Sequence, residues 1–255
     1  MVLLISWTCL VEKHIKQIAS FFSMLIMGID DAGRGPLIGP MFLTGVLVED
    51  KDEQYLKEEG VADSKKLTHP VRVRLAELIK ETAQAFYIVS ASPLQIDHAL
   101  NSGINLNTLE AMKTAEIINK LNSKKEKIKV IVDCPSVNTK AWRATLMSYL
   151  QHTENLEVYC EHKADVNYPS VSAASILAKV TREEAVTRLQ EEYGDIGSGY
   201  PSDPVTQAFL KKNGMRLKDA GIFRTTWQTW KSLFLEEGSQ KQSKLFDFRE
   251  SKWIK

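Results

Sequence analysis

Residues 24–40 read Met-Leu-Ile-Met-Gly-Ile-Asp-Asp-Ala-Gly-Arg-Gly-Pro-Leu-Ile-Gly-Pro, and the interpretation of the whole chain starts from this stretch. The apolar run at residues 25–29 has the length and β-branching of a buried strand. It ends in two adjacent carboxylates, Asp30 and Asp31, and a glycine-rich turn follows. Buried paired acids are costly unless a cation neutralises them, and glycines let a backbone such as a phosphodiester come close. These residues alone leave two interpretations open, a metal site and a solvated turn.

The composition is ordinary for a soluble globular protein, but the charge is unevenly distributed. The chain has 255 residues, 44% of them hydrophobic and 25% charged, which is enough for one large domain with a sizeable core. The net charge is +1, yet residues 205–255 contain 11 Lys or Arg against 5 Asp or Glu. A basic tail on a mildly acidic body suits an anionic partner such as nucleic acid, and a solvated helix face is the alternative.

The three cysteines and five histidines form no recognisable metal or disulfide pattern. Cys9, Cys134 and Cys160 lack a CxxC spacing and no HExxH sequence occurs, so zinc sites are not expected. Such cysteines are typical of a reducing compartment, and we expect a cytoplasmic protein that does not bind a membrane. The apolar run at residues 2–11 is too short to span a bilayer. We interpret residues 1–26 as a doubtful extension ahead of a natural start at Met27.

Beyond residue 40, the apolar patterns predict a strand meander followed by alternating helices and strands. After residues 25–29, the expected strands are 41–48, 86–91, 130–133 and 156–160. The expected helices are 51–59 (or an exposed loop), 70–82, 93–100, 105–121, 138–150, 171–193, 204–212 and 226–235. This order predicts an α/β fold in which a mixed sheet is flanked by helices.

Carboxylates recur at or just after the ends of three predicted strands. Asp133 ends one strand, and Asp165 lies a few residues beyond the next. Mixed sheets can bring such ends together, and with Asp30 and Asp31 they would form an oxygen-ligand site that prefers Mg²⁺ or Mn²⁺ over zinc. Two such ions about 4 Å apart are the usual device for in-line phosphodiester hydrolysis. Helix capping or turn formation is the alternative for Asp133 or Asp165 taken alone.

Five short motifs, in this order, resemble type 2 ribonuclease H, the ribonuclease HII family. They are Gly28-Ile-Asp-Asp-Ala-Gly-Arg-Gly-Pro36, Asp63-Ser-Lys-Lys-Leu67, Val132-Asp133, HKADVNYPSVSAASILAK at residues 162–179, and Gly197-Ser-Gly-Tyr-Pro-Ser-Asp203. The last motif is similar to the archaeal form. The matches extend from about residue 27 to the helix with Trp227 and Trp230, and their order is more specific than any single motif.

The resemblance implies a ribonuclease H-like catalytic domain at residues 27–203 and a helical, basic, substrate-binding extension at residues 204–255. It implies an endonuclease that cleaves RNA within RNA–DNA hybrids and nicks duplex DNA on the 5′ side of a single embedded ribonucleotide. The products would carry a 3′-hydroxyl and a 5′-phosphate, and two Mg²⁺ or Mn²⁺ ions would be the cofactors. It also implies a monomer, and residues 246–255 contain no convincing motif for docking to a partner such as a replication clamp.

The resemblance assigns the metal-binding catalytic carboxylates to Asp30, Asp31, Asp133 and Asp165. One departure concerns Asp31, because the family typically has Asp-Glu where this chain has Asp-Asp. Aspartate is one methylene shorter, so its carboxylate would lie about 1 Å back from the usual place, and catalytic groups tolerate little such error. We therefore expect activity that is retained but weaker, or that has a shifted preference between Mg²⁺ and Mn²⁺.

The resemblance also assigns residues to the nucleic acid. The residues implied to contact it at the ribonucleotide, where the 2′-hydroxyl distinguishes RNA from DNA, are Gly33, Arg34 and Gly35. Tyr200 would pack against the deoxyribose that follows the ribonucleotide. Lys65 and Lys66 would bind phosphates, which is a contribution independent of sequence.

Several of these residues have a plainer alternative. Tyr200 could fill the base of its Gly/Pro loop, and Lys65 and Lys66 could be solvated charges at the entry to a helix. Asn105 and Asn107 are further candidates for the substrate strand, although Asn105 could equally cap the helix that follows it.

Two other functions stay open at this point. The first is a different nuclease of the same superfamily, such as a junction resolvase, against which the Gly-Arg-Gly sequence and Tyr200 argue. The second is a nucleic-acid-binding protein without catalysis, in which Asp31 marks a degenerate site.

Overall fold

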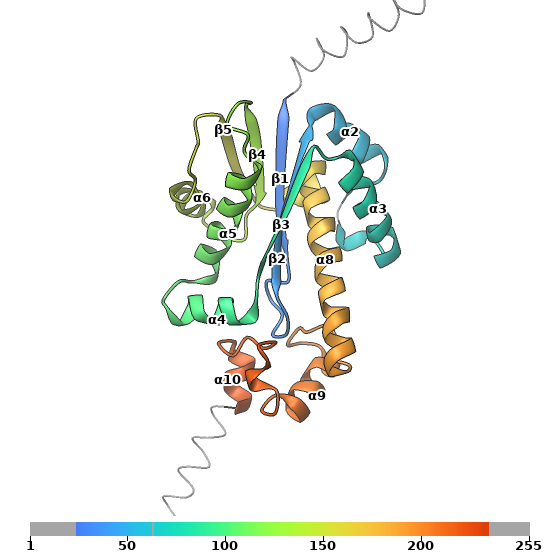
Figure 1. Cartoon of the computed structure of the whole chain (residues 1–255), viewed down its shortest axis with the longest axis vertical. Coiled ribbons are helices and arrows are strands. Elements are labelled where there is room, and N and C mark those ends of the chain that lie inside the picture. The colour runs from blue at the N-terminus through green and yellow to red at the C-terminus, as the bar shows by residue number, and fades with distance from the viewer. Residues whose placement is uncertain (1–23, 63, 235–255) are drawn as a thin grey trace, which may run out of the picture.

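The computed structural model describes residues 24–62 and 64–234, and their central feature is a five-stranded mixed sheet (Figure 1). Its strands are β1 (Leu25–Ala32), β2 (Met41–Glu49), β3 (Ala85–Ala91), β4 (Ile128–Asp133) and β5 (Leu156–Glu161). The strand order is β3-β2-β1-β4-β5. The first three strands form an antiparallel meander, whereas β1, β4 and β5 are parallel neighbours. The predicted α/β fold with a mixed sheet is confirmed.

The helices follow the predicted segments with small shifts at their ends. They are α2 (Asp50–Glu58), α3 (His69–Thr82), α4 (Pro93–Asn101), α5 (Leu106–Leu121), α6 (Thr139–Ser148), α7 (Ala164–Asn167), α8 (Pro169–Tyr193), α9 (Pro204–Asn213) and α10 (Gln228–Phe234), with 3-10 turns η1 (Ser64–Lys66) and η2 (Lys218–Ala220). Asn105 caps α5, because its side chain accepts a hydrogen bond of 2.9 Å from the Thr108 amide. The single turn of α7 is not predicted from sequence, because four residues are too few to show a helical period.

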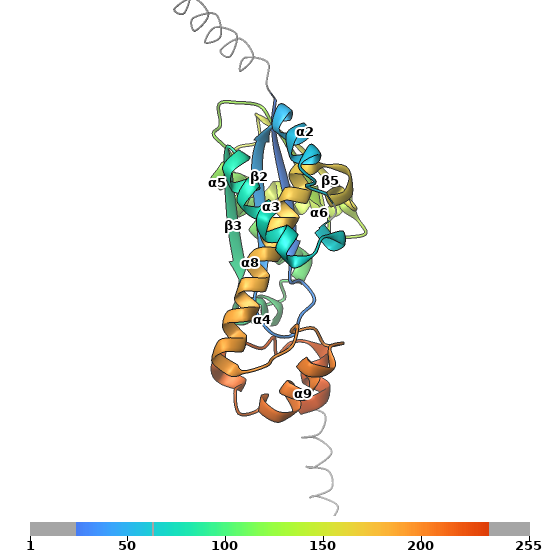
Figure 2. The same ribbon diagram turned by 90° about the vertical axis from the view of Figure 1, so that its right-hand side faces the viewer.

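Helices cover both faces of the sheet (Figures 1 and 2). Leu25, Met27 and Ile29 of β1 are buried in the cluster that contains α4, α5 and α6. Ile26, between them, is buried in the cluster that contains α2, α3 and α8. Successive side chains of a strand point to opposite faces, so a strand buried on both faces reads as a continuous apolar run. The apolar run at the start of the chain is therefore the centre of a three-layer structure.

Helix α8 lies directly on β1 at Gly28. A Cβ atom added to Gly28 would lie 2.1 Å from the carbonyl carbon of Ser170 and 2.3 Å from the amide nitrogen of Val171. The first turns of α8 present small buried side chains to the sheet: Ser170, Ser172, Ala173, Ala174, Ser175 and Ala178. The helix thus packs at close range along the strand that carries the paired acids.

The C-terminal helices pack against the loop that follows β1, at the lower end of the molecule in Figure 1. Leu37 and Ile38 of that loop share a buried cluster with Phe223 and Trp230. Main-chain hydrogen bonds join the two segments, from the Gly39 amide to the Ile222 carbonyl at 2.9 Å and from the Arg224 amide to the Leu37 carbonyl at 2.9 Å. The C-terminal segment therefore contacts the chain immediately beyond the glycine-rich turn.

Some sequence predictions fall outside the described residues. Residues 1–23, which make up most of the predicted N-terminal extension, lie outside them, as do Asp63 and residues 246–255. Leu25 and Ile26 of that predicted extension belong to β1, where they pair with Glu49 and Val48 of β2. Within the described part of the chain, none of the helices has both the length and the apolar character required to cross a membrane.

Candidate active site

Asp30 and Asp31 lie within β1, because this strand continues as far as Ala32. The strand is predicted over residues 25–29 with the acids at its end, and the structure extends it through them, since Asp30 pairs with Thr44 and Asp31 with Leu43 of β2. Adjacent strand residues point to opposite faces, and the two acids accordingly have different neighbours. Apart from burial, the charge of Asp31 and then that of Lys179 on α8 affect the pKa of Asp30 most, whereas Glu110 of α5 and then Arg34 affect the pKa of Asp31 most.

The parallel pairing of β1 with β4 brings Asp133 beside Asp30. Ile29 is aligned with Val132, so the next residue of each strand lies at the same level. Asp133 in turn accepts a hydrogen bond of 3.1 Å from the Ala164 amide at the start of α7. The chain enters α7 through Lys163, whose backbone is left-handed at φ 58°, and this turn directs Asp165 back toward the ends of the strands.

Three carboxylates meet at this edge of the sheet. Asp30, Asp133 and Asp165 each offer one oxygen atom, and these atoms lie within 4.8 Å of one another. Asp30 and Asp165 are only 7% and 2% exposed, so their charges are largely removed from water. Oxygen ligands alone, with no His or Cys in the group, fit a hard divalent cation such as Mg²⁺ or Mn²⁺. Asp31 lines the same pocket but is outside this group of oxygens.

The surroundings of these acids disfavour their charged forms. Desolvation and the charge of Asp31 raise the pKa of Asp30 to about 8. Desolvation and the charge of Glu110 raise the pKa of Asp31 to about 7. Burial also raises the pKa of Asp133. Without a cation, Asp30 and Asp31 therefore retain protons near neutral pH, and a cation that binds these carboxylates must displace them.

We expect a divalent cation to stabilise the protein more strongly as the pH rises from about 6 to about 8. In the folded, cation-free protein the pKa values of Asp30 and Asp31 lie above their ordinary value of 3.8, so both groups destabilise the fold progressively as the pH rises. A bound cation reverses this loss. Melting temperatures with and without Mn²⁺ at several pH values measure the effect, and a shift independent of pH would contradict it. Asp30→Asn should make the Mn²⁺-induced shift in melting temperature less dependent on pH.

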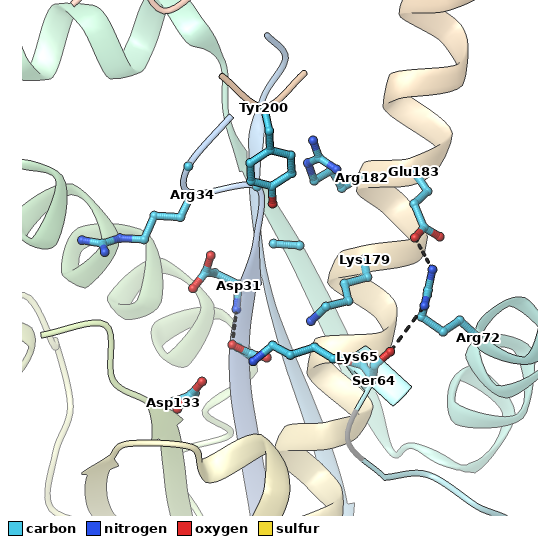
Figure 3. A pocket seen from close by; sticks show the side chains of 14 residues that line it. Asp31, Arg34, Ser64, Lys65, Arg72, Asp133, Lys179, Arg182, Glu183 and Tyr200 are labelled. Atoms are coloured by element: carbon cyan, nitrogen blue, oxygen red, sulfur yellow. Dashed lines mark hydrogen bonds and ion pairs between the residues drawn. The ribbon is translucent and has the colours of Figure 1, made fainter. Parts of the chain in front are cut away.

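Cationic side chains surround the acids in a pocket of about 430 Å³ (Figure 3). The lining residues are Asp30, Asp31, Ala32, Gly33, Arg34, Gly35, Ser64, Lys65, Arg72, Asp133, Lys179, Arg182, Glu183 and Tyr200. The Lys65 ammonium lies 3.6 Å from Asp165, and the Lys179 ammonium donates a hydrogen bond of 2.7 Å to Ser175. Arg72 pairs with Glu183 and donates to the Leu67 carbonyl at 2.5 Å, which holds η1 against the pocket. A pocket with acids at its base and cations on its walls suits a phosphodiester together with divalent cations.

Gly33, Arg34 and Gly35, called the GRG loop below, form another part of the pocket wall. Gly33 has φ +85°, and a Cβ there would lie 2.8 Å from the Arg182 side chain and 2.9 Å from the Pro40 carbonyl oxygen, so only glycine fits. The Arg34 guanidinium bonds Glu110 at 2.8 Å and Asn107 at 2.6 Å on α5. Figure 3 shows it pointing away from Lys179 and Arg182.

Tyr200 lies beside the GRG loop at the mouth of the pocket. Its side chain is 39% exposed and lies under the Arg182 guanidinium, whose central carbon is 5.0 Å from the ring centroid. An added Cβ on Gly35 would lie 3.5 Å from the same ring. Tyr200 is thus available at the pocket and does not fill the base of its loop. Lys66, by contrast, is exposed and is not among the residues that line the pocket.

Sequence reasoning missed several polar residues of this site. Ser175, Lys179 and Arg182 are spaced by four and three residues along α8, so they share one helical face, yet the start of α8 is predicted from sequence only to pack on the sheet. Glu110 interrupts the apolar stripe of α5, and it is 1% exposed with one carboxylate oxygen that has no hydrogen-bond partner among the described residues. A charged residue within an apolar stripe is the signal that could have identified it.

Comparison with known proteins agrees with the site. The family model for ribonuclease HII matches residues 27–230. The ribonuclease HII of Methanocaldococcus jannaschii is 39% identical over 234 residues, which cover 87% of this chain and 99% of the relative. The crystal structure of ribonuclease H2 from Pyrococcus horikoshii OT3 has a TM-score of 0.73 and 36% identity, covering 82% of this chain and 97% of that one. The ribonuclease HII in the PCNA complex from Archaeoglobus fulgidus has a TM-score of 0.71 and 37% identity. The match covers 80% of this chain and 96% of that one.

These matches decide between the functions that the sequence left open. Both the family match and the relatives span most of the chain, and the relatives are ribonucleases rather than junction resolvases. The sheet flanked by helices is the ribonuclease H-like fold of the solved relatives. The chain therefore belongs to the ribonuclease HII family and is a ribonuclease H, a metal-dependent endonuclease that acts on nucleic acid.

Proposed function

We propose that this ribonuclease cleaves RNA in RNA–DNA hybrids and nicks duplex DNA on the 5′ side of a single embedded ribonucleotide. The observation that carries this proposal is one pocket lined by carboxylates, by the GRG loop and by Tyr200. The carboxylates are suited to phosphodiester hydrolysis, and the loop and the tyrosine are suited to recognition of the sugar beside the cleaved bond. The 2′-hydroxyl is the group by which a protein distinguishes RNA from DNA at one nucleotide.

Asp30, Asp31, Asp133 and Asp165 would hold two divalent cations, either Mg²⁺ or Mn²⁺. When bound, such ions supply an activated water and stabilise the leaving oxygen in an in-line displacement. The acids contribute the ligand charge, and the turn at Lys163 supports the position of Asp165. Hydrolysis by this route leaves a 3′-hydroxyl and a 5′-phosphate.

The residues around the acids would bind and orient the substrate. Gly33, Arg34 and Gly35 would contact the ribonucleotide, and Tyr200 would pack against the deoxyribose that follows it. Lys65 lies on the pocket wall and Lys66 lies outside it, so Lys65 would contact a phosphate near the cleaved bond and Lys66 a more distant one. The basic segment at residues 204–255 would add contacts to the phosphate backbone, and these contacts should weaken with salt.

We also propose that the enzyme acts as a monomer. The support is that residues of a single chain supply all three clustered carboxylates as well as the loop and the tyrosine. The A. fulgidus relative was solved in a complex with PCNA, so a sliding clamp is a second candidate partner for this chain. Light scattering after size-exclusion chromatography, with and without an archaeal clamp, tests both proposals.

One assay separates the proposed function from its alternatives. The protein is incubated with Mg²⁺ and three DNA substrates of matched sequence: a duplex with one ribonucleotide, an all-DNA duplex and an all-DNA four-way junction. We expect nicking of the ribonucleotide-containing duplex only. Junction cleavage would contradict the proposed substrate, and binding without cleavage would contradict catalysis.

Replacing Asp31 with glutamate should increase the cleavage rate by up to about tenfold in Mg²⁺ and by less in Mn²⁺. The Asp31 carboxylate lies outside the close group of oxygens, and one more methylene extends its reach by about 1 Å. Mg²⁺ demands a nearly ideal octahedral geometry, so it is the ion more sensitive to a misplaced ligand. Single-turnover rates in both metals measure the effect, with Asp31→Asn as the control without charge. If the wild-type protein is inert while Asp31→Glu cleaves, retained activity is excluded.

A further inference from the structure

A buried arginine from the C-terminal segment holds the main chain of the GRG loop. Arg224 is 0% exposed although it carries a charge. Its guanidinium donates hydrogen bonds to the carbonyl oxygens of Gly33 at 2.6 Å, Arg34 at 2.7 Å and Gly39 at 3.0 and 3.2 Å. The partners are 185 to 191 residues away in sequence, and none of these hydrogen bonds is to a carboxylate. The fork of five N–H donors is what permits one side chain to hold several carbonyls at once.

Trp227 holds the main chain of the third residue of the GRG loop, Gly35. Its indole N–H donates a hydrogen bond of 3.1 Å to the Gly35 carbonyl oxygen. Its ring also lies against the Arg224 guanidinium, whose central carbon is 4.9 Å from the ring centroid. The carbonyls of Gly33, Arg34 and Gly35 are therefore all held by the segment 224–227, called the strap below.

The direction of these carbonyls fixes the direction of the loop amides. The structure contains no cis peptide bond in its described residues, and in a trans peptide the N–H of one residue points opposite to the carbonyl of the residue before it. Because the carbonyls of Gly33 and Arg34 point toward Arg224, the N–H groups of Arg34 and Gly35 point away from it. Among the hydrogen bonds of the described residues, neither N–H has an acceptor. Two oriented donors are therefore left for a ligand at the pocket wall.

The strap is itself fastened to the body of the protein by a buried aspartate. Asp97 of α4 is 7% exposed. One of its oxygens accepts hydrogen bonds from the amide and hydroxyl of Thr225 at 2.6 and 2.7 Å, and the other accepts from those of Thr226 at 3.2 and 2.5 Å. These two residues lie directly between Arg224 and Trp227 in the sequence. The Asp97 carboxylate therefore fixes the position of the strap relative to the GRG loop.

We propose that Arg224 is a positioning residue for ribonucleotide recognition, which aims the Arg34 and Gly35 amides at the sugar and scissile phosphate of the ribonucleotide. The proposal rests on the proposed function of the GRG loop. Within the described residues, the hydrogen bonds of the Arg224 side chain go to main-chain carbonyls and not to the acids, and Arg224 is not among the residues that line the pocket. Burial and the nearby charge of Arg182 lower the pKa of Arg224 to about 10, which still leaves it protonated at neutral pH. Its expected effect is on discrimination between RNA and DNA, not on the metal site.

Binding measured in EDTA tests this role without relying on cleavage. Fluorescence anisotropy gives the affinities for two duplexes of identical sequence, one all-DNA and one with a single ribonucleotide, and their ratio is the preference for the ribonucleotide. Arg224→Lys keeps the charge but replaces three donor nitrogens by one, which cannot reproduce the fork that reaches the carbonyls of Gly33, Arg34 and Gly39. We therefore expect the preference to fall about fivefold or more. The affinity for all-DNA duplex should stay within about twofold, because phosphate contacts dominate it.

Two further variants keep the test decisive. Trp227→Phe removes the single hydrogen bond to Gly35 but keeps an aromatic ring against Arg224, so a smaller fall in preference is expected even if Arg224→Lys does not fold. Arg188→Lys is the matched control, because Arg188 is an exposed arginine of α8 that is not among the residues lining the pocket. Melting temperatures, with and without Mn²⁺, show whether each variant is folded and binds the cation.

The outcomes are distinguishable. A lower preference in Arg224→Lys or Trp227→Phe, with unchanged DNA affinity and an unchanged Mn²⁺ shift, supports the proposal. A wild-type preference that both variants keep, or an equal loss of affinity for both duplexes, overturns it and leaves the proposed function intact. If the wild-type protein shows no preference at all, recognition of the ribonucleotide fails as well.

Discussion

Asp30→Asn is expected to reduce the cleavage rate by at least about a thousandfold. Asparagine has the same shape and keeps one oxygen, but it removes the charge of the acid that lies beside both Asp133 and Asp165. Metal affinity and catalysis both depend on that charge, so the loss should exceed the effect of a group that only supports a ligand. Single-turnover cleavage of a ribonucleotide-containing duplex in Mg²⁺ measures it.

The same substitution should raise the stability of the cation-free protein. The raised pKa of Asp30 means that its charged form is unfavourable in the fold, and a neutral side chain removes that cost at pH above neutrality. The melting temperature in EDTA at about pH 8 should therefore increase while activity disappears. Asp219→Asn, in the exposed turn η2, is the control and should change neither quantity. Wild-type cleavage by Asp30→Asn would exclude this carboxylate from catalysis.

Gly28→Ala is expected to destabilise the protein by about 3 kcal/mol, the upper end of the usual cost of an added methyl group in a packed core. The added methyl group would overlap the main chain of α8 at Ser170 and Val171, which cannot move aside as a flexible side chain can. Helix α8 would have to shift away from β1, and it carries Lys179 and Arg182 at the pocket. Urea denaturation, with the free energy of unfolding extrapolated to water, measures the loss.

Gly60→Ala is a suitable control for this substitution. Gly60 has φ +91° and nothing within 4 Å of an added Cβ, so alanine there costs only backbone strain of about 1–2 kcal/mol. A Gly28→Ala variant as stable as Gly60→Ala would show that α8 does not pack on β1 as closely as described.

The elements of the fold are largely predictable from sequence because most are long and regular. Strand β1 is buried on both faces and reads as an apolar run, and α5 shows a clear apolar stripe. The end of β1 is not predictable, because a strand that contains two acids looks like a turn until their neighbours are known. The short helix α7 and the left-handed backbone of Lys163 before it are also not predictable from sequence, although they place Asp165 in the site.

The site is only partly predictable, because its acids lie in or shortly after the last residues of strands but their supporting residues come from distant segments. The family resemblance assigns Asp30, Asp133 and Asp165, which the structure brings together. The contact of Arg34 with Glu110 joins residues 76 apart, and that of Arg224 with the GRG loop joins residues about 190 apart. The local spacing of apolar residues in the sequence cannot predict such contacts, since they depend on how the sheet and the C-terminal helices pack together.

The position and chemistry of the cut in a duplex with one ribonucleotide test the proposed metal-dependent cleavage directly. The two product strands are sized at single-nucleotide resolution, and their ends are identified by extension with a polymerase and by treatment with phosphatase. We expect one nick on the 5′ side of the ribonucleotide, with a 3′-hydroxyl on the upstream strand and a 5′-phosphate on the ribonucleotide, only when Mg²⁺ or Mn²⁺ is present. A cut on the 3′ side that leaves a 2′,3′-cyclic phosphate, or cleavage that persists in EDTA, would contradict it.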